Sequence, residues 1–503
     1  MTSLRLSGNA RPEGGEAMAE GQGPARAAVG SFGALGAMAV GLLALKLALM
    51  LSAAVTQDEA YYFLWALHPG LSYYDHPPLN AWALAVSSSL FGWTTFAVRA
   101  PVILSSIATV WVLYLWAKRR GGDGWQAQFW ISVILYGSMP VILAATSAAL
   151  PDHLLVLFGL ASAHFFLAFF EDYEAGAADY RLLYLGAAAL GFSGLAKYNA
   201  GFLGIGVALL ILLSARLRPL LVSPHLYLAA GLSLAMQAPV LIWNLGTGLA
   251  SFHFILAGRH GLLTATPIFG AIGPVLLTTL FVLSPFALPA LFRLLFGPDA
   301  GPARRLGVIV FLLSSVVTFT LSLYTFVLFH WNLVAYLILL PLAAGWIGRR
   351  LAIAQAAYGA VALLAGIVNF AALPLTALMG VPDRFSAHSY GWTEVAAAVE
   401  AAEAQTGAAF LAGAAYPLAA QLAFALRNPE VTSLYPSIDE FDFWFDPAAH
   451  RGRSAIIVAD GFHPLGRGID SRFETVTELT PVEIERFGIR INEIRFYVGT
   501  GFR

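Results

Sequence analysis

The stretch ALGAMAVGLLALKLALMLSAAV, residues 34–55, decides the fold class, because Lys46 is its only charged side chain. A helix of this length rises about 33 Å at 1.5 Å per residue, enough to cross the roughly 30 Å hydrocarbon core of a bilayer. Apolar runs of similar length recur as far as Leu375. We therefore predict a polytopic all-α membrane bundle of about eleven transmembrane helices.

Composition supports this prediction. Of the 503 residues, 58% are hydrophobic and only 11% are charged, against about 25% charged in soluble domains. A net charge of -1, with no basic stripe, argues against nucleic acid as a partner. The absence of cysteine restricts any metal ligands to histidine and carboxylate side chains. The predicted spans are residues 34–55, 99–117, 126–145, 153–170, 182–196, 200–215, 226–243, 270–292, 306–329, 331–347 and 351–375.

Basic residues give the orientation, because Lys and Arg are retained on the cytoplasmic side of a membrane. They follow every second predicted span, as at residues 118–120 and at residues 349–350. The other loops are poor in Lys and Arg but carry acidic and histidine residues. With a cytoplasmic N-terminus, these loops and the C-terminal region are predicted to face outward.

Three segments differ in composition. Residues 1–30 lack periodicity and are predicted to be a disordered cytoplasmic tail. Residues 31–375 are predicted to form the transmembrane part, and residues 376–503 are predicted to form a soluble α/β domain. The predicted C-terminal helices are 393–405 and 418–428, and the strand-like runs are 408–413, 454–460, 473–479 and 492–502. The acidic, aromatic stretch SIDEFDFWFD, residues 437–446, is interpreted as a solvated loop, with acceptor contact as the alternative.

The first outer loop begins QDEAYYFLWALHPG at residue 57. Asp58 and Glu59 stand where the first predicted helix leaves the membrane. A carboxylate there can take a proton from a hydroxyl group, as a general base does. The alternative is that the pair caps a helix at the level of the headgroups.

The second half of this loop reads YYDHPP, residues 73–78. It joins the carboxylate of Asp75 and the imidazole of His76 to two prolines that fix the backbone. Such a segment can hold a divalent cation or a phosphate group. The alternative is a rigid turn with an ordinary Asp–His hydrogen bond.

Two further charged residues lie at the outer ends of predicted spans. Asp152 follows Pro151 at the start of the fourth span, where the helix dipole alone would favour an acidic residue. Lys197 ends the fifth span, on a side where lysine is scarce. It can neutralise a departing phosphate group, or it can extend to lipid headgroups.

The fourth outer loop, GTGLASFHFILAGRHGLLTATP at residues 246–267, contains His253, Arg259 and His260. An arginine guanidinium binds phosphate through two parallel hydrogen bonds. The alternative is an amphipathic anchor on the membrane surface.

An Asp-Glu pair after the first helix, a Tyr-x-x-Pro-Pro motif before the second and a Pro-Asp step at the fourth resemble the C-type (GT-C) glycosyltransferases. Within that superfamily, the chain is most similar to bacterial protein-mannosyltransferase-like and lipid A aminoarabinose- or galacturonic-acid-transferase-like enzymes. The resemblance implies transfer of a sugar from a polyprenyl-phosphate donor, at the periplasmic face of the inner membrane. The implied acceptor is lipid A or its core, another envelope glycan, or a protein.

The resemblance also implies roles for individual residues. Asp58 matches the acidic residue that activates the acceptor hydroxyl, and Asp75 matches a metal-ligand position, so that one divalent ion such as Mg, Mn or Zn is expected. The implied catalytic residues are Asp58, Glu59 and Asp152; the implied donor-phosphate contacts are Lys197, Arg259, His76 and Tyr74; the implied metal ligands are Asp75 and a histidine that is either His253 or His260.

A transporter or flippase for a lipid-linked sugar is the alternative function. Such a protein is expected to place its ionisable residues near the middle of the bilayer, often within inverted repeats. In this chain they gather at one face, which favours the transferase.

Overall fold

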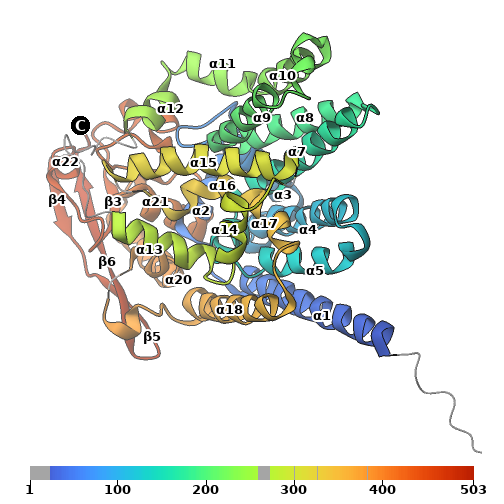
Figure 1. Ribbon diagram of the computed structural model, residues 1–503. Helices are drawn as coiled ribbons and strands as arrows, with labels where there is room; N and C mark the ends of the chain where they lie inside the picture. Colours follow the sequence, from blue (N-terminus) through green and yellow to red (C-terminus); the bar gives the residue numbers. More distant parts are fainter. Residues whose placement is uncertain (1–22, 259–271, 300, 326, 382) are drawn as a thin grey trace, which may run out of the picture.

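The computed structural model describes residues 23–258, 272–299, 301–325, 327–381 and 383–503. Helices α1 to α18 form a bundle, and a sheet lies at one end of it, called the sheet end below (Figure 1). The bundle helices are α1 Gly23–Ser52, α2 Gln57–Leu67, α3 Leu79–Phe91, α4 Thr95–Arg120, α5 Trp125–Tyr136, α6 Pro140–Ser147, α7 Asp152–Glu174, α8 Tyr180–Ala196, α9 Gly201–Leu213, α10 Pro224–Ala235, α11 Ala238–Gly246, α12 Ala250–His253, α13 Ile272–Leu283, α14 Leu288–Phe296, α15 Pro302–Ser322, α16 Leu333–Leu337, α17 Leu339–Ala344 and α18 Arg349–Ile367.

Within the described residues, 5 helical segments are long and apolar enough to cross a membrane. They are Gly33–Ser52, Thr95–Arg120, Asp152–Glu174, Pro302–Ser322 and Arg349–Ala372. Three bent helix pairs raise the number of possible spans to 8. A largely helical membrane architecture is thus confirmed, whereas the predicted count of eleven spans is not.

The bent pairs explain part of the difference between the eleven predicted spans and the 5 long helical segments of the structure. Helices α5 and α6 meet at 71°, α10 and α11 at 45°, and α13 and α14 at 107°. In each pair the second helix has a proline in its first turn, and proline cannot donate the hydrogen bond that would continue the preceding helix. Hydrophobicity alone predicted one straight helix for each pair.

Three other predicted spans are short or broken. The predicted span 182–196 corresponds to α8, which has only 17 residues. The predicted span 200–215 corresponds to the helical segment Tyr198–Leu213, which is shorter than a typical span. The predicted span 331–347 is divided into the 3₁₀ turn Phe329–Asn332 followed by α16 and α17.

A buried lysine ties the first span to its neighbours. Nζ of Lys46 in α1 donates to the hydroxyl oxygens of Tyr136 at 2.9 Å and of Thr146 at 2.6 Å. Those residues lie in α5 and α6, so the hydrogen bonds satisfy an ammonium group that apolar surroundings would otherwise exclude.

The sheet end carries a six-stranded mixed sheet of order β2-β1-β3-β6-β4, with β5 paired to β6. Strands β1, β2 and β3 run parallel, and β6 is antiparallel to β3. The predicted strand runs and both predicted helices of this region are present. The elements are α19 Arg384–Ala387, α20 Trp392–Thr406, β1 Phe410–Gly413, α21 Tyr416–Leu426, β2 Thr432–Ser433, β3 Ala455–Asp460, α22 Arg467–Asp470, β4 Thr475–Glu478, β5 Val482–Arg486 and β6 Ile489–Thr500.

The sheet shares its hydrophobic core with α2. One cluster of buried side chains contains Phe63 and Trp65 of α2 together with Leu418 of α21 and Ile457 of β3. The ring of Phe63 lies 5.3 Å from the ring of Phe424 in α21. The C-terminal region is therefore packed onto the segment that follows the first span, and the predicted domain boundary near residue 376 stays a prediction.

Basic residues gather at the far end of α4, some 39 Å from its start by helical rise. Arg119 pairs with Glu171 at 3.0 Å and with Asp172 at 2.7 Å, and Arg120 pairs with Glu171 at 2.7 Å. The predicted cytoplasmic charges thus lie away from the sheet end. The orientation in a membrane remains a prediction.

Candidate active site

Helix α2 holds Asp58 at the sheet end. Thr56 caps this helix, and its backbone N–H donates to Oε2 of Glu59 at 3.0 Å in a capping box. Asp58 and Glu59 therefore occupy the first helical turn, as the capping interpretation predicted. Successive positions of a helix point in different directions. Of these two carboxylates, Asp58 is partly exposed and Glu59 is buried.

Glu59 is fully buried in an ion pair with Arg99 of α4, at 2.9 Å. Its Oε1 also accepts the N–H of Ala149, at 2.7 Å, and Arg99 donates to the backbone oxygens of Ser147 and Ala54. These contacts tie α2 to α4 and to the loop before α7. They give Glu59 a structural role, and its predicted catalytic role stays a prediction.

Asp58 faces the C-terminal region. The hydroxyl of Tyr416, the first residue of α21, donates to Oδ1 of Asp58 at 3.1 Å. The Tyr416 ring lies 4.7 Å from the ring of Tyr61 in α2. Burial, followed by the negative charge of Asp58, raises the pKa of Tyr416, so this hydroxyl keeps its proton and acts as the donor.

Acidic side chains surround these tyrosines, and Asp58, Asp75, Asp439 and Glu440 are together called the acidic side. The N–H of Tyr74 donates to Oε2 of Glu440 at 2.5 Å, and the N–H of Glu440 donates to the Tyr61 hydroxyl oxygen at 2.8 Å. Burial, with added repulsion from Asp75, raises the pKa of Glu440. The stretch 437–446 is thus partly buried against the first outer loop, and its interpretation as a solvated loop is wrong for Asp439 and Glu440.

A second charged pair joins α7 to the end of α8. Nζ of Lys197 lies 2.8 Å from both carboxylate oxygens of Asp152, and about 95% of each side chain is buried. Asp152 begins α7, and Lys197 is the C-cap of α8. The structure therefore brings together two predicted site residues that are 45 positions apart.

Lys197 also lines a cavity of about 410 Å³. His76 from the first outer loop lines the same cavity, so two predicted phosphate contacts share one space. The remaining wall is largely apolar and includes Phe202, Leu256 and Leu321. The amide of Asn199 donates to the backbone oxygen of Trp331 at 2.7 Å, which fixes one side of this cavity.

The fourth outer loop covers the first. The ring of Phe254 lies 4.6 Å from the ring of Tyr74, and the hydroxyls of Ser251 and Tyr198 are 2.9 Å apart. His253 is an exposed residue at the end of α12. Arg259 and His260 fall outside the described residues, so their predicted roles stay predictions.

The predicted metal ligands do not form a described cluster. Among the described residues, the one group of three or more potential ligands is His388, Asp460 and His463. Asp75 and His253 do not belong to it, and the alternative predicted histidine, His260, lies beyond the described part. The metal site predicted at Asp75 therefore stays a prediction.

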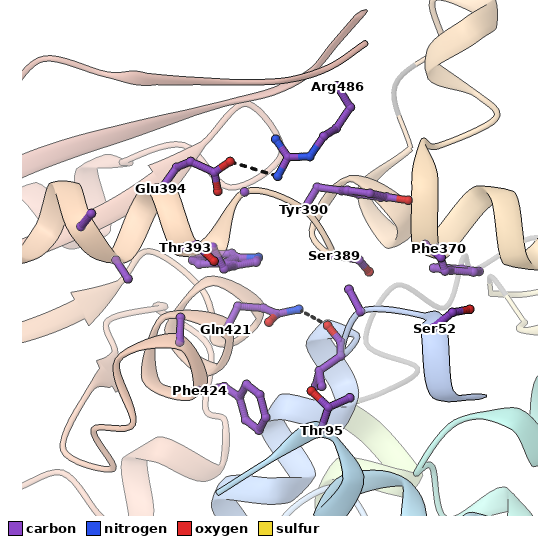
Figure 2. A pocket seen from close by; sticks show the side chains of 18 of the residues that line it. Ser52, Thr95, Phe370, Ser389, Tyr390, Thr393, Glu394, Gln421, Phe424 and Arg486 are labelled. Atoms are coloured by element: carbon purple, nitrogen blue, oxygen red, sulfur yellow. Dashed lines mark hydrogen bonds and ion pairs between the residues drawn. The ribbon is translucent and has the colours of Figure 1, made fainter. Parts of the chain in front are cut away.

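A larger cavity of about 1030 Å³ lies between the end of α1, the start of α4 and the C-terminal helices. Figure 2 shows Ser52 and Thr95 on the bundle side and Tyr390, Glu394 and Arg486 on the other. Its described lining contains none of the predicted site residues. Size alone therefore does not identify the candidate active site.

Several site residues escaped prediction. Tyr416 lies 358 positions from Asp58 in the sequence, and Glu440 lies 366 positions from Tyr74. No local pattern signals contacts at such separations. The cluster of acidic and aromatic residues at 437–446 was the available signal for Glu440.

Known proteins resemble parts of the chain. The family model of dolichyl-phosphate-mannose-protein mannosyltransferase matches residues 75–243. An undecaprenyl phosphate-alpha-4-amino-4-deoxy-L-arabinose arabinosyl transferase of Shewanella sediminis is 26% identical over 141 residues, which make up 28% of this chain and 24% of that protein. The lipid A galacturonosyltransferase RgtD of Rhizobium johnstonii is 27% identical over 235 residues, which make up 44% of this chain and 46% of that protein.

The overall fold has a solved counterpart. The crystal structure of ArnT from Cupriavidus metallidurans bound to undecaprenyl phosphate matches with a TM-score of 0.59, covering 93% of this chain and 98% of that one at 16% identity. The GT-C resemblance is confirmed. Because the curated matches span less than half of each GT-C relative, they support a transferase without fixing its sugar or acceptor. None of these names describes a transporter, so that alternative gains no support.

Proposed function

We propose that this protein is a GT-C glycosyltransferase that moves a sugar from a polyprenyl-phosphate donor to an acceptor hydroxyl at the sheet end. We infer that this end faces the periplasm of a bacterial inner membrane, with residues 31–375 in and around the membrane and residues 376–503 outside it. A glycolipid such as lipid A is the favoured acceptor, because one of the two curated relatives is a lipid A transferase by name. Another envelope glycan or a protein is the alternative acceptor.

In the proposed reaction, Asp58 is the general base. It accepts the proton of the acceptor hydroxyl while that oxygen forms a bond to the anomeric carbon of the sugar. The bond from that carbon to the phosphate oxygen breaks, and its electron pair leaves with the polyprenyl phosphate. Attack from the side opposite to the leaving group inverts the anomeric configuration.

The observation that carries this proposal is the cavity shared by Lys197 and His76. Its polar end offers an ammonium group and an imidazole, and its apolar wall offers Phe202, Leu256 and Leu321. A polyprenyl phosphate has this same division, an anionic head on a hydrocarbon chain. A positive charge at the departing phosphate stabilises the transition state more than the ground state, because negative charge builds up there.

The ion pair with Asp152 gives Lys197 a fixed position. Two contacts at 2.8 Å hold the ammonium group against the cavity, so little reorganisation is needed when phosphate charge develops. We therefore assign Asp152 to positioning, and Lys197 with His76 to the donor phosphate. Tyr74 and Arg259 remain proposed phosphate contacts from the two loops that meet over this region.

Mass spectrometry of envelope glycolipids tests the proposal. Cells lacking the gene are complemented with the wild-type chain, with Asp58→Asn, or with Asp123→Asn, a matched change at an exposed aspartate in the loop before α5. We expect one sugar mass to be present with the wild type and Asp123→Asn and to be absent with Asp58→Asn at equal membrane abundance. Full restoration by Asp58→Asn would refute the assignment of the base.

A further inference from the structure

Three potential metal ligands meet in the C-terminal region, apart from every residue used above. Nε2 of His388 lies 2.7 Å from Oδ2 of Asp460, and Nδ1 of His463 lies 3.4 Å from Oδ1 of the same carboxylate. All three ligand atoms lie within 4.8 Å of one another. The side chains of His388 and Asp460 are fully buried, and that of His463 is 14% exposed.

A simple His–Asp ion pair does not account for this arrangement. Such a pair needs only His388, yet a second imidazole is directed at the same carboxylate. At 3.4 Å, the His463 nitrogen is too distant for a well-formed hydrogen bond, although that nitrogen is buried. A cation between the three groups would satisfy both imidazoles and the carboxylate together.

The groups around the cluster hold the ligands in position, as outer partners do at metal sites. Nδ1 of His388 lies 2.5 Å from Oε1 of Gln57, which leaves Nε2 directed at the cluster. Oδ1 of Asp460 accepts the N–H groups of Phe462 at 3.0 Å and His463 at 2.7 Å. Burial opposes ionisation of Asp460, but the contacts with His388, His463 and Asn492 together outweigh this effect and keep the pKa of the carboxyl low.

A cavity of about 690 Å³ lies beside the cluster. It is lined by Gly461, Phe462 and Asn492, which adjoin the cluster in sequence or through the hydrogen bond from Asn492 to Asp460. None of the three proposed ligands belongs to the described lining of this cavity.

We propose that His388, Asp460 and His463 bind one zinc-class divalent ion. Two imidazoles and one carboxylate suit zinc and its transition-metal neighbours, whereas magnesium and calcium prefer all-oxygen sites. Shifts of roughly 1 Å bring the three atoms to the separations of about 3.3 Å found around tetrahedral zinc.

The ion would have a structural role near the proposed base. His388 follows α19, Asp460 ends β3, and Gln57 is the first residue of α2, one position before Asp58. The ion therefore fastens the sheet to the start of the helix that carries Asp58. The site does not depend on the proposed function, because its formation requires no substrate.

Metal analysis of the full-length protein tests this site. The protein is purified in detergent without a polyhistidine tag, and its zinc content and melting temperature are measured before and after treatment with EDTA. The variants are Asp460→Asn, which keeps the acceptor of the β3 turn, and His463→Gln at the most exposed ligand. His450→Gln is the matched control in the same region, and Asp75→Asn reports on the other predicted metal site.

We expect about one zinc per wild-type chain, a melting temperature that EDTA lowers and added zinc restores, and at least a tenfold weaker retention of zinc in Asp460→Asn and His463→Gln. His450→Gln and Asp75→Asn should keep the metal. Wild-type protein that holds no metal and ignores EDTA would overturn the proposal. Loss of metal in Asp75→Asn, with retention in Asp460→Asn, would overturn it as well. If neither cluster variant folds, the wild-type titration alone decides.

Discussion

The acidic side and the Lys197 cavity both adjoin the first outer loop but differ in electrostatic character. Around Tyr61 and Tyr416, burial and repulsion from neighbouring carboxylates raise the pKa of Asp439 and Glu440, so these two groups favour taking up protons. Around Lys197, one buried carboxylate balances one ammonium group, and the rest of the wall is apolar.

In the proposed reaction, this difference separates two tasks. A base must face an acceptor hydroxyl, whereas a departing phosphate needs a cation and its lipid needs an apolar wall. Adjacent residues in the sequence, Asp75 and His76, point into these two environments, since Asp75 acts on Tyr61 and Tyr74 while His76 lines the cavity. Substitutions in the acidic side or in the Lys197 cavity should impair one of these regions and leave the other intact.

The largest effect is expected from the Lys197 cavity. Lys197→Gln should lower sugar transfer by about 10²–10³-fold and destabilise the protein by about 3–5 kcal/mol, because it leaves the Asp152 carboxylate buried without its partner. The double variant Asp152→Asn with Lys197→Gln removes both charges and should regain stability but not transfer. Melting temperature and transfer rate are measured side by side, and a double variant with normal transfer would make the pair purely structural.

Glu59→Gln should affect stability rather than chemistry. It leaves Arg99 buried with its charge uncompensated, which costs about 3–5 kcal/mol of the free energy of unfolding. The folded fraction should keep wild-type transfer per molecule. Glu171→Gln is the matched control, because its ion pairs at the other end of α4 are partly exposed and contribute about 1 kcal/mol or less. Equal losses of stability in the two variants would contradict the structural role of Glu59.

Tyr416→Phe tests whether Tyr416 orients Asp58 on the acidic side. It removes the hydrogen bond to Asp58, and loss of a hydrogen bond to a charged group is expected to lower kcat/KM about tenfold. Because the ring packing remains, the melting temperature should fall only by the loss of this one hydrogen bond. Tyr435→Phe, at an exposed tyrosine of the same region, should behave as the wild type. If the two variants are equally active, Tyr416 does not orient Asp58.

The last prediction concerns pH. Burial, with repulsion from Asp442 and Asp75, raises the pKa of Asp439 from 3.8 to about 7. Between those values the folded protein binds more protons than the unfolded chain, so the free energy of unfolding should fall as the pH rises from about 4 to about 7, by at most about 1.4 kcal/mol per pH unit.

Melting temperatures measured across this pH range test the effect. Asp439→Asn should flatten the dependence, and the exposed Asp446→Asn should preserve it. If the melting temperature of Asp439→Asn depends on pH as strongly as that of the wild type, another group titrates in this range.

The sequence predicted what depends on local pattern. Apolar runs located the long helices, and periodicity located α20, α21 and four of the six strands of the C-terminal sheet, namely β1, β3, β4 and β6; β2 and β5 were not predicted. Residue type and sidedness selected His76, Asp152 and Lys197, which the structure places around or beside one cavity.

Contacts between distant segments were not predictable from one sequence. The bends at α5–α6, α10–α11 and α13–α14 depend on how proline-containing turns pack, which hydropathy does not report. The difference between Asp58 and Glu59 arises because Arg99 reaches only one of two adjacent carboxylates. The cluster of His388, Asp460 and His463 joins a loop to a strand end 72 positions away, a separation that no spacing motif covers.

The most direct test of the proposed sugar transfer follows the donor lipid itself. Purified protein is reconstituted in vesicles that contain lipid-linked sugars and envelope glycolipids extracted from the source cells, and mass spectrometry follows both lipid pools. If the proposed reaction is correct, the wild type releases free polyprenyl phosphate while an acceptor gains one sugar mass. With Asp58→Asn, neither product should form. Movement of intact lipid-linked sugar across the vesicle membrane without its cleavage, or equal release by Asp58→Asn, would contradict the proposed reaction.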